Sequence, residues 1–134
     1  MKDQKQPDYR KEIESLIESS RQNLADAQKL LETGGYRSAI SRAYYAFLGL
    51  AKAALLTKGI MTQTQDGAVT KFGQVFVKTN IIKGNYGRSF NRALESRLEA
   101  DYEIFRNFTT EEVETVIKEA QSFLKELDEK IFSQ

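Results

Sequence analysis

The sequence predicts an all-α protein, an up-and-down antiparallel bundle of four main helices and one short helix in 134 residues. Apolar residues recur at intervals of three, four and seven, which is the period of an amphipathic helix. No segment shows the strict alternation of apolar and polar residues that is typical of a half-buried strand. The single proline is Pro7, so no later helical segment is interrupted by proline. We expect one domain over residues 1–134, with 1–7 as a flexible N-terminus.

The first two helices are expected over residues 8–32 and 36–58. Gly34 and Gly35 separate them, and glycine is the usual residue just after a helix. The second segment is rich in alanine, serine and glycine and is apolar around much of its circumference. Small side chains let neighbouring helices approach closely, so this helix is expected to be the central and most buried one.

The second half of the chain predicts one short and two longer helices. The short helix is expected over 68–78, and Gly84 and Gly87 then indicate a connection. A fourth helix is expected from about residue 88 to between 102 and 105. Thr109 and Glu112 have the spacing of a capping box, which predicts the start of a last helix that runs to about residue 131.

The composition excludes several classes of function. The chain contains neither histidine nor cysteine, which excludes a Ser-His-Asp triad, a HExxH zinc site and a disulfide framework. Acidic residues alone could form only a hard-cation site, and no group of them supplies enough ligands, so we expect no metal and no cofactor. The first residues are polar and no apolar stretch is long enough to span a bilayer, which predicts a cytoplasmic protein without membrane contact.

The net charge of +1 conceals an uneven distribution. Residues 33–94 carry nine basic side chains and one acid, whereas residues 95–134 carry five basic and eleven acidic ones. Cations with aromatic residues between them suit a nucleotide or single-stranded RNA, and the alternative is a solvated helix face. Gly84 to Gly87 could form a loop that holds phosphate. The candidate basic surface consists of Lys71, Lys78, Lys83, Arg88 and Arg92.

The second predicted helix carries the most specific pattern. Arg42, Tyr45 and Lys52 share one face of it, together with Gly49. An arginine in the middle of such a helix needs a partner, which is either a carboxylate such as Asp101 or Glu99 or a bound phosphate. Tyr44 and Tyr45 are interpreted either as core aromatics or as platforms on which bases stack.

Three blocks of sequence resemble the HEPN domains, and among these the small stand-alone prokaryotic proteins of the uncharacterised group. The first block is Arg42, Tyr44, Tyr45, Ala46, Lys52, Leu55 and Leu56. The second is Thr64-Gln65-Asp66-Gly67 with Phe72-Gly73, and the third is Arg97-Leu98-Glu99-Ala100-Asp101-Tyr102. The blocks occur in the family's order and cover the chain from about residue 10 to 130, so the resemblance implies a HEPN-like helical bundle.

The resemblance also implies ribonuclease activity, but this chain lacks part of the motif on which that activity depends. Many HEPN proteins are ribonucleases with an Arg-x(4–6)-His motif. Here the family's histidine in the second helix falls at Gly49 and that of the second block at Gln65. Without histidine the acid–base group is missing, and tyrosine or lysine, with pKa values near 10, are poor bases at pH 7. We therefore expect no catalytic residues.

Three hypotheses follow. In the first, the chain is a homodimer that pairs through its small-residue surface and, as the resemblance implies, binds nucleotide or RNA phosphate and works with a minimal nucleotidyltransferase in a toxin–antitoxin-like pair. Arg42, Tyr45, Lys52 and Arg97 would hold the phosphate, and Asp101 and Tyr102 would be structural partners of an arginine. In the second, the chain is a ribonuclease that acts without histidine. In the third, it is a purely structural homo-oligomer.

Overall fold

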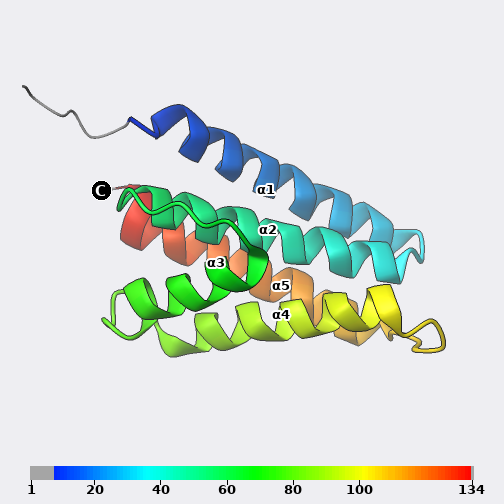
Figure 1. The fold of residues 1–134 in the computed structure, drawn as a ribbon. Coiled ribbons are helices and arrows are strands. Elements are labelled where there is room, and N and C mark those ends of the chain that lie inside the picture. Colours follow the sequence, from blue (N-terminus) through cyan, green and yellow to red (C-terminus); the bar gives the residue numbers. More distant parts are fainter. Residues whose placement is uncertain (1–7, 134) are drawn as a thin grey trace, which may run out of the picture.

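The computed structural model describes residues 8–133, and their five α-helices and two π-helical turns pack as one bundle (Figure 1). The all-α prediction is confirmed, and no strand occurs in this part of the chain. The expected flexible N-terminus, residues 1–7, lies outside the described residues. The elements are α1 (Arg10–Glu32), α2 (Tyr36–Leu56), α3 (Gln65–Phe72), η1 (Gly73–Val77), α4 (Gly84–Tyr102), α5 (Thr110–Leu127) and η2 (Asp128–Phe132).

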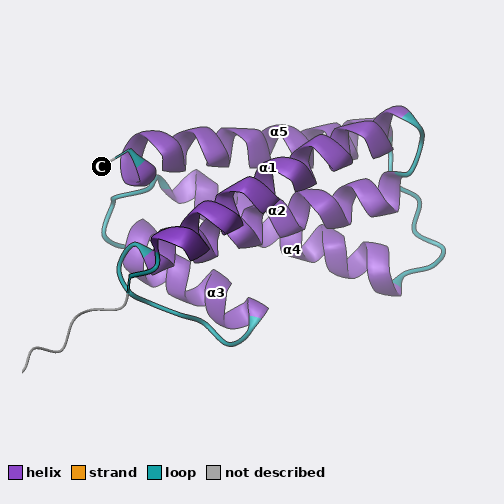
Figure 2. Cartoon of the chain, turned by 90° about the horizontal axis from the view of Figure 1, so that it is seen from above, coloured by secondary structure: helices purple, strands orange, loops and turns teal. Residues whose placement is uncertain are grey.

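Helix α2 occupies the centre of the bundle, as the sequence predicts. Figure 1 shows α2 between α1 and α4 with α5 behind it, and Figure 2 shows α1 lying across α2 and α5. Successive long helices alternate in direction, and the short α3 connects α2 to α4. The core contains packed aromatic rings: the centre of the Phe123 ring lies 5.1 Å from that of Phe47 and 5.3 Å from that of Phe72.

The alanines of α2 take part in this core rather than in an outer surface. Ala39, Ala43, Ala46, Ala51 and Ala54 have no exposed area. They let α1, α4 and α5 pack closely around α2, because an alanine adds little bulk between two helix backbones. The expectation that a second subunit would bind through this small-residue surface is therefore wrong.

Two helix ends follow the sequence signals closely. Gly34 adopts a φ of 84°, and the N–H of Gly35 donates to the carbonyl of Leu30 over 2.7 Å, which ends α1 in a Schellman motif. At the start of α5, the Thr109 hydroxyl accepts from the N–H of Glu112, and the Glu112 carboxylate accepts from the N–H of Thr109, each over 3.1 Å. The predicted capping box is confirmed.

Two other helices begin earlier than predicted. Helix α3 begins at Gln65 because the Thr64 hydroxyl accepts from the N–H of Gly67 over 2.9 Å and caps it. Helix α4 begins at Gly84, so residues 84–87 form its first turn, and the prediction of a phosphate-holding loop there is wrong. A Cβ atom on Gly87 would lie 3.2 Å from Cγ2 of Val77, so this glycine allows α4 to pack against η1.

Helix α1 packs tightly only in its second half. Ser20, Leu24 and Ala27 are buried, whereas no residue from Arg10 to Ser19 is. The first half lies further from α2 in Figure 1, and surface grooves run along both of its sides. None of the helices within residues 8–133 has the length and apolar character needed to cross a membrane.

Candidate functional site

A pocket of about 260 Å³, here called the α2–α4 pocket, lies between the first half of α2 and the end of α4. The spacing of the α2 residues places them on one side of the helix, where they face the last turn of α4. Three residues singled out in the sequence, Arg42, Tyr45 and Asp101, lie together in this pocket. Its lining consists of Arg37, Ser38, Ser41, Arg42, Tyr45, Ala100 and Asp101.

Arg97 lies beside this pocket and is held from several sides. Its Nη2 atom is 3.0 Å from a carboxylate oxygen of Asp101 and donates to the Tyr45 hydroxyl over 3.1 Å. Its guanidinium carbon lies 5.7 Å from the ring centre of Tyr44 and 5.5 Å from that of Tyr45. The side chain is 20% exposed. Arg97 therefore fixes α4 against α2, with Asp101 as its ionic partner.

Tyr44 is a core residue that extends the same network towards α3. Its side chain is fully buried, and its hydroxyl donates to Oε1 of Gln65 over 3.0 Å. Burial raises the pKa of Tyr44 to about 12, although the Arg97 charge acts in the opposite direction. The hydroxyl therefore stays protonated at neutral pH, and Tyr44 is unsuited to act as a general base.

Arg42 differs from Arg97 in having an exposed guanidinium. Its one hydrogen bond within residues 8–133 joins Nη1 to the amide oxygen of Asn23 and is 3.4 Å long. The two carboxylates considered as its partners are engaged elsewhere, Asp101 with Arg97 and Glu99 with Arg106. Arg42 thus lines the α2–α4 pocket with only a neutral, distant partner.

Arg37 is a pocket residue that the sequence patterns did not indicate. Its guanidinium donates to the carbonyl oxygens of Ala100 over 2.6 Å, Glu103 over 2.8 Å and Ile104 over 3.1 Å, and also to that of Arg106. A cation at a helix C-terminus satisfies carbonyl groups that have no partner within the helix. No sequence motif signals it, because its partners are backbone groups more than 60 residues away along the chain.

Arg106, which lies within the segment between α4 and α5, also holds this segment in place. It pairs with Glu99 over 3.3 Å and with Glu112, and it lies 4.2 Å from the ring centre of Phe108. The hydrogen bond from Arg106, with a second from the N–H of Thr109, lowers the pKa of Glu112 to about 2. The capping box therefore has a third member, which sequence spacing alone did not reveal.

The segment that these two arginines hold exposes large apolar side chains. Tyr102 is 75% exposed, Ile104 76% and Phe105 91%, and Leu98 is partly exposed one turn earlier. The sequence pattern indicated Tyr102 only as a structural partner of an arginine, but within residues 8–133 its hydroxyl makes no hydrogen bond. We refer to Leu98, Tyr102, Ile104 and Phe105 as the apolar corner.

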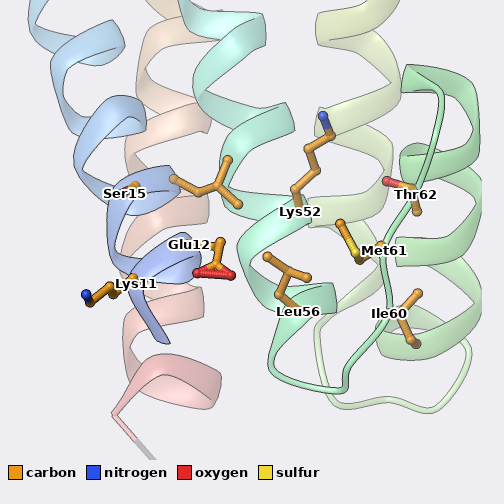
Figure 3. A pocket seen from close by; sticks show the side chains of 9 residues that line it. Lys11, Glu12, Ser15, Lys52, Leu56, Ile60, Met61 and Thr62 are labelled. Carbon is orange, nitrogen blue, oxygen red and sulfur yellow. The ribbon is translucent and has the colours of Figure 1, made fainter. Parts of the chain in front are cut away.

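Lys52 does not join the α2–α4 pocket. It lines a separate groove of about 460 Å³, the α1–α2 groove, which lies between the first half of α1 and the end of α2 (Figure 3). Leu56, Ile60 and Met61 give this groove an apolar wall, and Lys11 and Glu12 of α1 border it on the other side. Arg42 and Lys52 share a helix face but not a binding site.

Gly49 lies on the same face between Arg42 and Lys52, where α2 packs against Leu16 and Ser20 of α1. A Cβ atom on Gly49 would lie 2.4 Å from Oγ of Ser20 and 3.4 Å from the carbonyl oxygen of Leu16. The Ser20 hydroxyl is buried and has no hydrogen-bond partner within residues 8–133. A side chain at the position that the family resemblance assigns to histidine would therefore meet Ser20 of α1.

The candidate basic surface is exposed, but of the four aromatic residues between its cations Phe72, Phe76 and Phe90 are buried, and only Tyr86 is partly exposed. Lys71, Lys78, Lys83, Arg88 and Arg92 all lie at the surface. Arg92 pairs with Glu119 over 2.6 Å. Phe72, Phe76 and Phe90 are at most 1% exposed, so they cannot stack on bases, and this part of the sequence interpretation is wrong. Among the described residues no group of three or more acidic side chains is placed to hold a metal ion.

Comparison with known proteins identifies one family. The sequence model of the HEPN domain matches residues 13–130. A Methanocaldococcus jannaschii protein named "Putative toxin MJ0605" is 41% identical over 117 residues, which cover 87% of each chain. A UPF0332 protein of Thermotoga maritima is 34% identical, over 90% of this chain and 94% of the relative. A second M. jannaschii protein, "Putative toxin MJ0142", is 31% identical over 93% and 85% of the two chains.

Proposed function

The chain belongs to the HEPN domain family, and we propose that it is a non-catalytic module that binds a phosphate of a nucleotide or RNA. The observation that carries this proposal is the contrast among the arginines around the α2–α4 pocket. Arg37 and Arg97 are fixed by carbonyl and carboxylate oxygens, whereas Arg42 faces the pocket with one long bond to a neutral amide. A guanidinium in this state can grip two phosphate oxygens without first breaking an ion pair.

The rest of the pocket supports the same ligand class. Ser38 and Ser41 supply hydroxyl groups within the same lining, and Tyr45 presents a half-buried ring beside them. Hydroxyls donate to phosphate oxygens, and a tyrosine ring offers a face for a base or ribose. Asp101 is the one acid in the lining, and Arg97 neutralises much of its charge. Lys52 lies outside this site, so we propose no role for it in phosphate binding.

Titration calorimetry tests this proposal. We expect AMP, ATP or a short single-stranded RNA to bind at low salt and binding to weaken as salt rises, since phosphate contacts release counterions. Arg42→Ala should weaken binding about tenfold, which corresponds to one charge-assisted contact. Arg88→Ala is the matched control, because Arg88 is exposed on the other basic surface. Binding unaffected by Arg42→Ala but weakened by Arg88→Ala would move the site to that surface, and no binding to any of these ligands would refute the proposal.

A ribonuclease is the second candidate, and the relatives whose names contain the word toxin favour it. Against a ribonuclease stands the lack of a group for proton transfer, since the chain has no histidine and burial raises the pKa of Tyr44 to about 12. Incubation with labelled RNA separates the candidates. Cleavage that is lost in Arg42→Ala and absent from a mock-purified control would establish the ribonuclease and displace the binding module.

We also propose that the chain forms a homodimer through the apolar corner. An interface with two-fold symmetry needs a self-complementary patch, and an apolar patch fulfils this requirement. Charged residues of both signs lie next to the corner in the sequence, with Glu103 inside it and Arg106 directly after it. A second copy would also bring two α2–α4 pockets near one another. Light scattering of Phe105→Glu tests this surface: we expect a monomer, with the unchanged chain as the dimeric control.

A partner protein is the remaining part of the proposal. The resemblance implies a minimal nucleotidyltransferase in a toxin–antitoxin-like pair, and the names of the relatives are consistent with such a pair. The test is co-expression with the product of the neighbouring gene, followed by pull-down through a tag on this chain. Recovery of a nucleotidyltransferase supports the assignment, and recovery of the tagged chain alone under these conditions contradicts it.

A further inference from the structure

A second groove, of about 550 Å³, lies at the opposite end of the bundle from the apolar corner. It runs along the other side of α1 from the α1–α2 groove and is here called the terminal groove. Five separate segments contribute to it: the start of α1, the residues after α2, η1, the connection before α4 and η2. Both π-helical turns border it, and each is the last turn of a helix, η1 after α3 and η2 after α5.

The floor of the terminal groove is apolar. Phe76 is fully buried and Ile131 is 9% exposed, whereas Ile81 retains 40% of its surface. Each of these side chains comes from a different segment, so the floor exists only in the folded bundle. The complete apolar lining is Ile13, Ile17, Phe76, Ile81, Ile131 and Phe132.

The rim of the groove is basic. Arg10, Lys58 and Lys130 reach it from three different elements, against the one acid Glu14. Arg10 is paired with Asp8 over 2.9 Å, and within residues 8–133 neither lysine makes an ion pair. An apolar floor below a basic rim is complementary to a molecule with an apolar body and one anionic end. The volume falls within the range of about 300–1,000 Å³ that small-molecule sites occupy.

We propose that the terminal groove binds a single-chain amphipathic anion, with a medium-chain fatty carboxylate as the representative ligand. The alkyl chain lies over Ile13, Ile81 and Phe132, which keep part of their surface exposed, and the carboxylate faces Lys58 and Lys130. Burial of methylene groups supplies the affinity, and the lysines select the sign of the headgroup. This site is independent of the α2–α4 pocket and of the proposed phosphate ligand.

The first experiment is an NMR titration of the full chain with decanoate below its micelle concentration. We expect saturable binding, with amide shifts concentrated at Lys58, Ile81 and Ile131. Decyltrimethylammonium, which has the same tail and the opposite charge, should bind at least about tenfold more weakly, and acetate should not bind. Equal binding of the anionic and cationic probes, or no saturable binding of decanoate, would overturn the proposal.

Two pairs of variants locate the ligand. Lys58→Glu should weaken decanoate binding about fivefold, whereas Lys52→Glu in the α1–α2 groove should change it less than about twofold. Ile81→Glu should weaken it about tenfold, and Met61→Glu, an exposed apolar residue of the α1–α2 groove, is its control. These positions are exposed or partly exposed, so the variants are expected to fold, which circular dichroism verifies. Larger losses in the two control variants would place the ligand in the other groove and refute the assignment.

Discussion

Two points on one face of α2 differ sharply in what surrounds them. At Arg42 the face is open, and the guanidinium lines a pocket with a single 3.4 Å contact. Two turns later, at Gly49, α1 lies so close that a Cβ atom would be 2.4 Å from the Ser20 hydroxyl. Residues that share one face of α2 therefore need not share a binding site, because α1 covers part of that face and leaves the rest accessible.

The largest effect is expected from Gly49→His, which introduces the residue that the family resemblance places there. The imidazole would have to displace α1, and overpacking of this kind should lower the free energy of unfolding by about 3 kcal/mol. Urea unfolding measures the loss. Lys52→His, on the same face but at a groove, should stay within about 0.5 kcal/mol of the unchanged protein.

A smaller substitution at the same point shows whether contact with Ser20 is the cause. Gly49→Ala should be destabilising in the native sequence, because the new methyl group meets the Ser20 hydroxyl. In the Ser20→Ala background the same change should be neutral or stabilising, since alanine favours a helix over glycine by about 1 kcal/mol. Equal effects in both backgrounds would mean that Ser20 does not limit this position.

Arg97→Met is expected to have the next largest effect. The substitution removes the ion pair with Asp101, the hydrogen bond to Tyr45 and the contacts with two aromatic rings. Because the side chain is only 20% exposed, we expect a loss of about 2 kcal/mol in the free energy of unfolding. Thermal and urea unfolding should agree, and a loss below about 0.5 kcal/mol would show that Arg97 does not fasten α4 to α2.

Glu112→Gln should alter the stability of the protein in acid. The pKa of Glu112 is about 2 in the folded chain against an ordinary value of 4.5, so unfolding takes up a proton between these pH values. Stability from this carboxylate is therefore complete above about pH 4.5 and is lost as the pH falls towards 2. Exposure of the pair to solvent keeps this contribution small. Urea unfolding from pH 7 to pH 2 should show a shallower acid loss in Glu112→Gln, and identical pH profiles would contradict it.

The smallest effect on stability is expected from Arg42→Ala. The side chain is exposed and makes one long contact, so the free energy of unfolding should change by less than about 0.5 kcal/mol. Paired with the loss of phosphate binding proposed above, this result would separate a ligand-binding arginine from a structural one. A loss comparable to that in Arg97→Met would show that Arg42 is structural and would remove the main support for the phosphate site.

Sequence signals predicted the features that depend on residues close together in the chain. The end of α1 at Gly34 and Gly35 and the capping box of Thr109 and Glu112 are local arrangements, and both were confirmed. The start of α4 was not predicted, because Gly84 and Gly87 indicate a loop unless the packing against Val77 is known. The roles of Arg37 and Arg106 also escaped sequence analysis, since the first binds backbone carbonyls and the second pairs with acids that belong to two different helices.

The sequence by itself determined the all-α class, the central place of α2, the membership of the HEPN family and the lack of a histidine for acid–base chemistry. The class, the place of α2 and the lack of histidine follow from periodicity, side-chain size and composition, and the family follows from the similarity of its sequence motifs. None of these depends on distances between helices. Only the tertiary structure decided that Asp101 pairs with Arg97 rather than Arg42, that α1 closes Gly49, and that Lys52 belongs to a different groove. Each of these depends on the distance between helices, which is set by how the side chains of several elements pack together and not by spacing along any one of them.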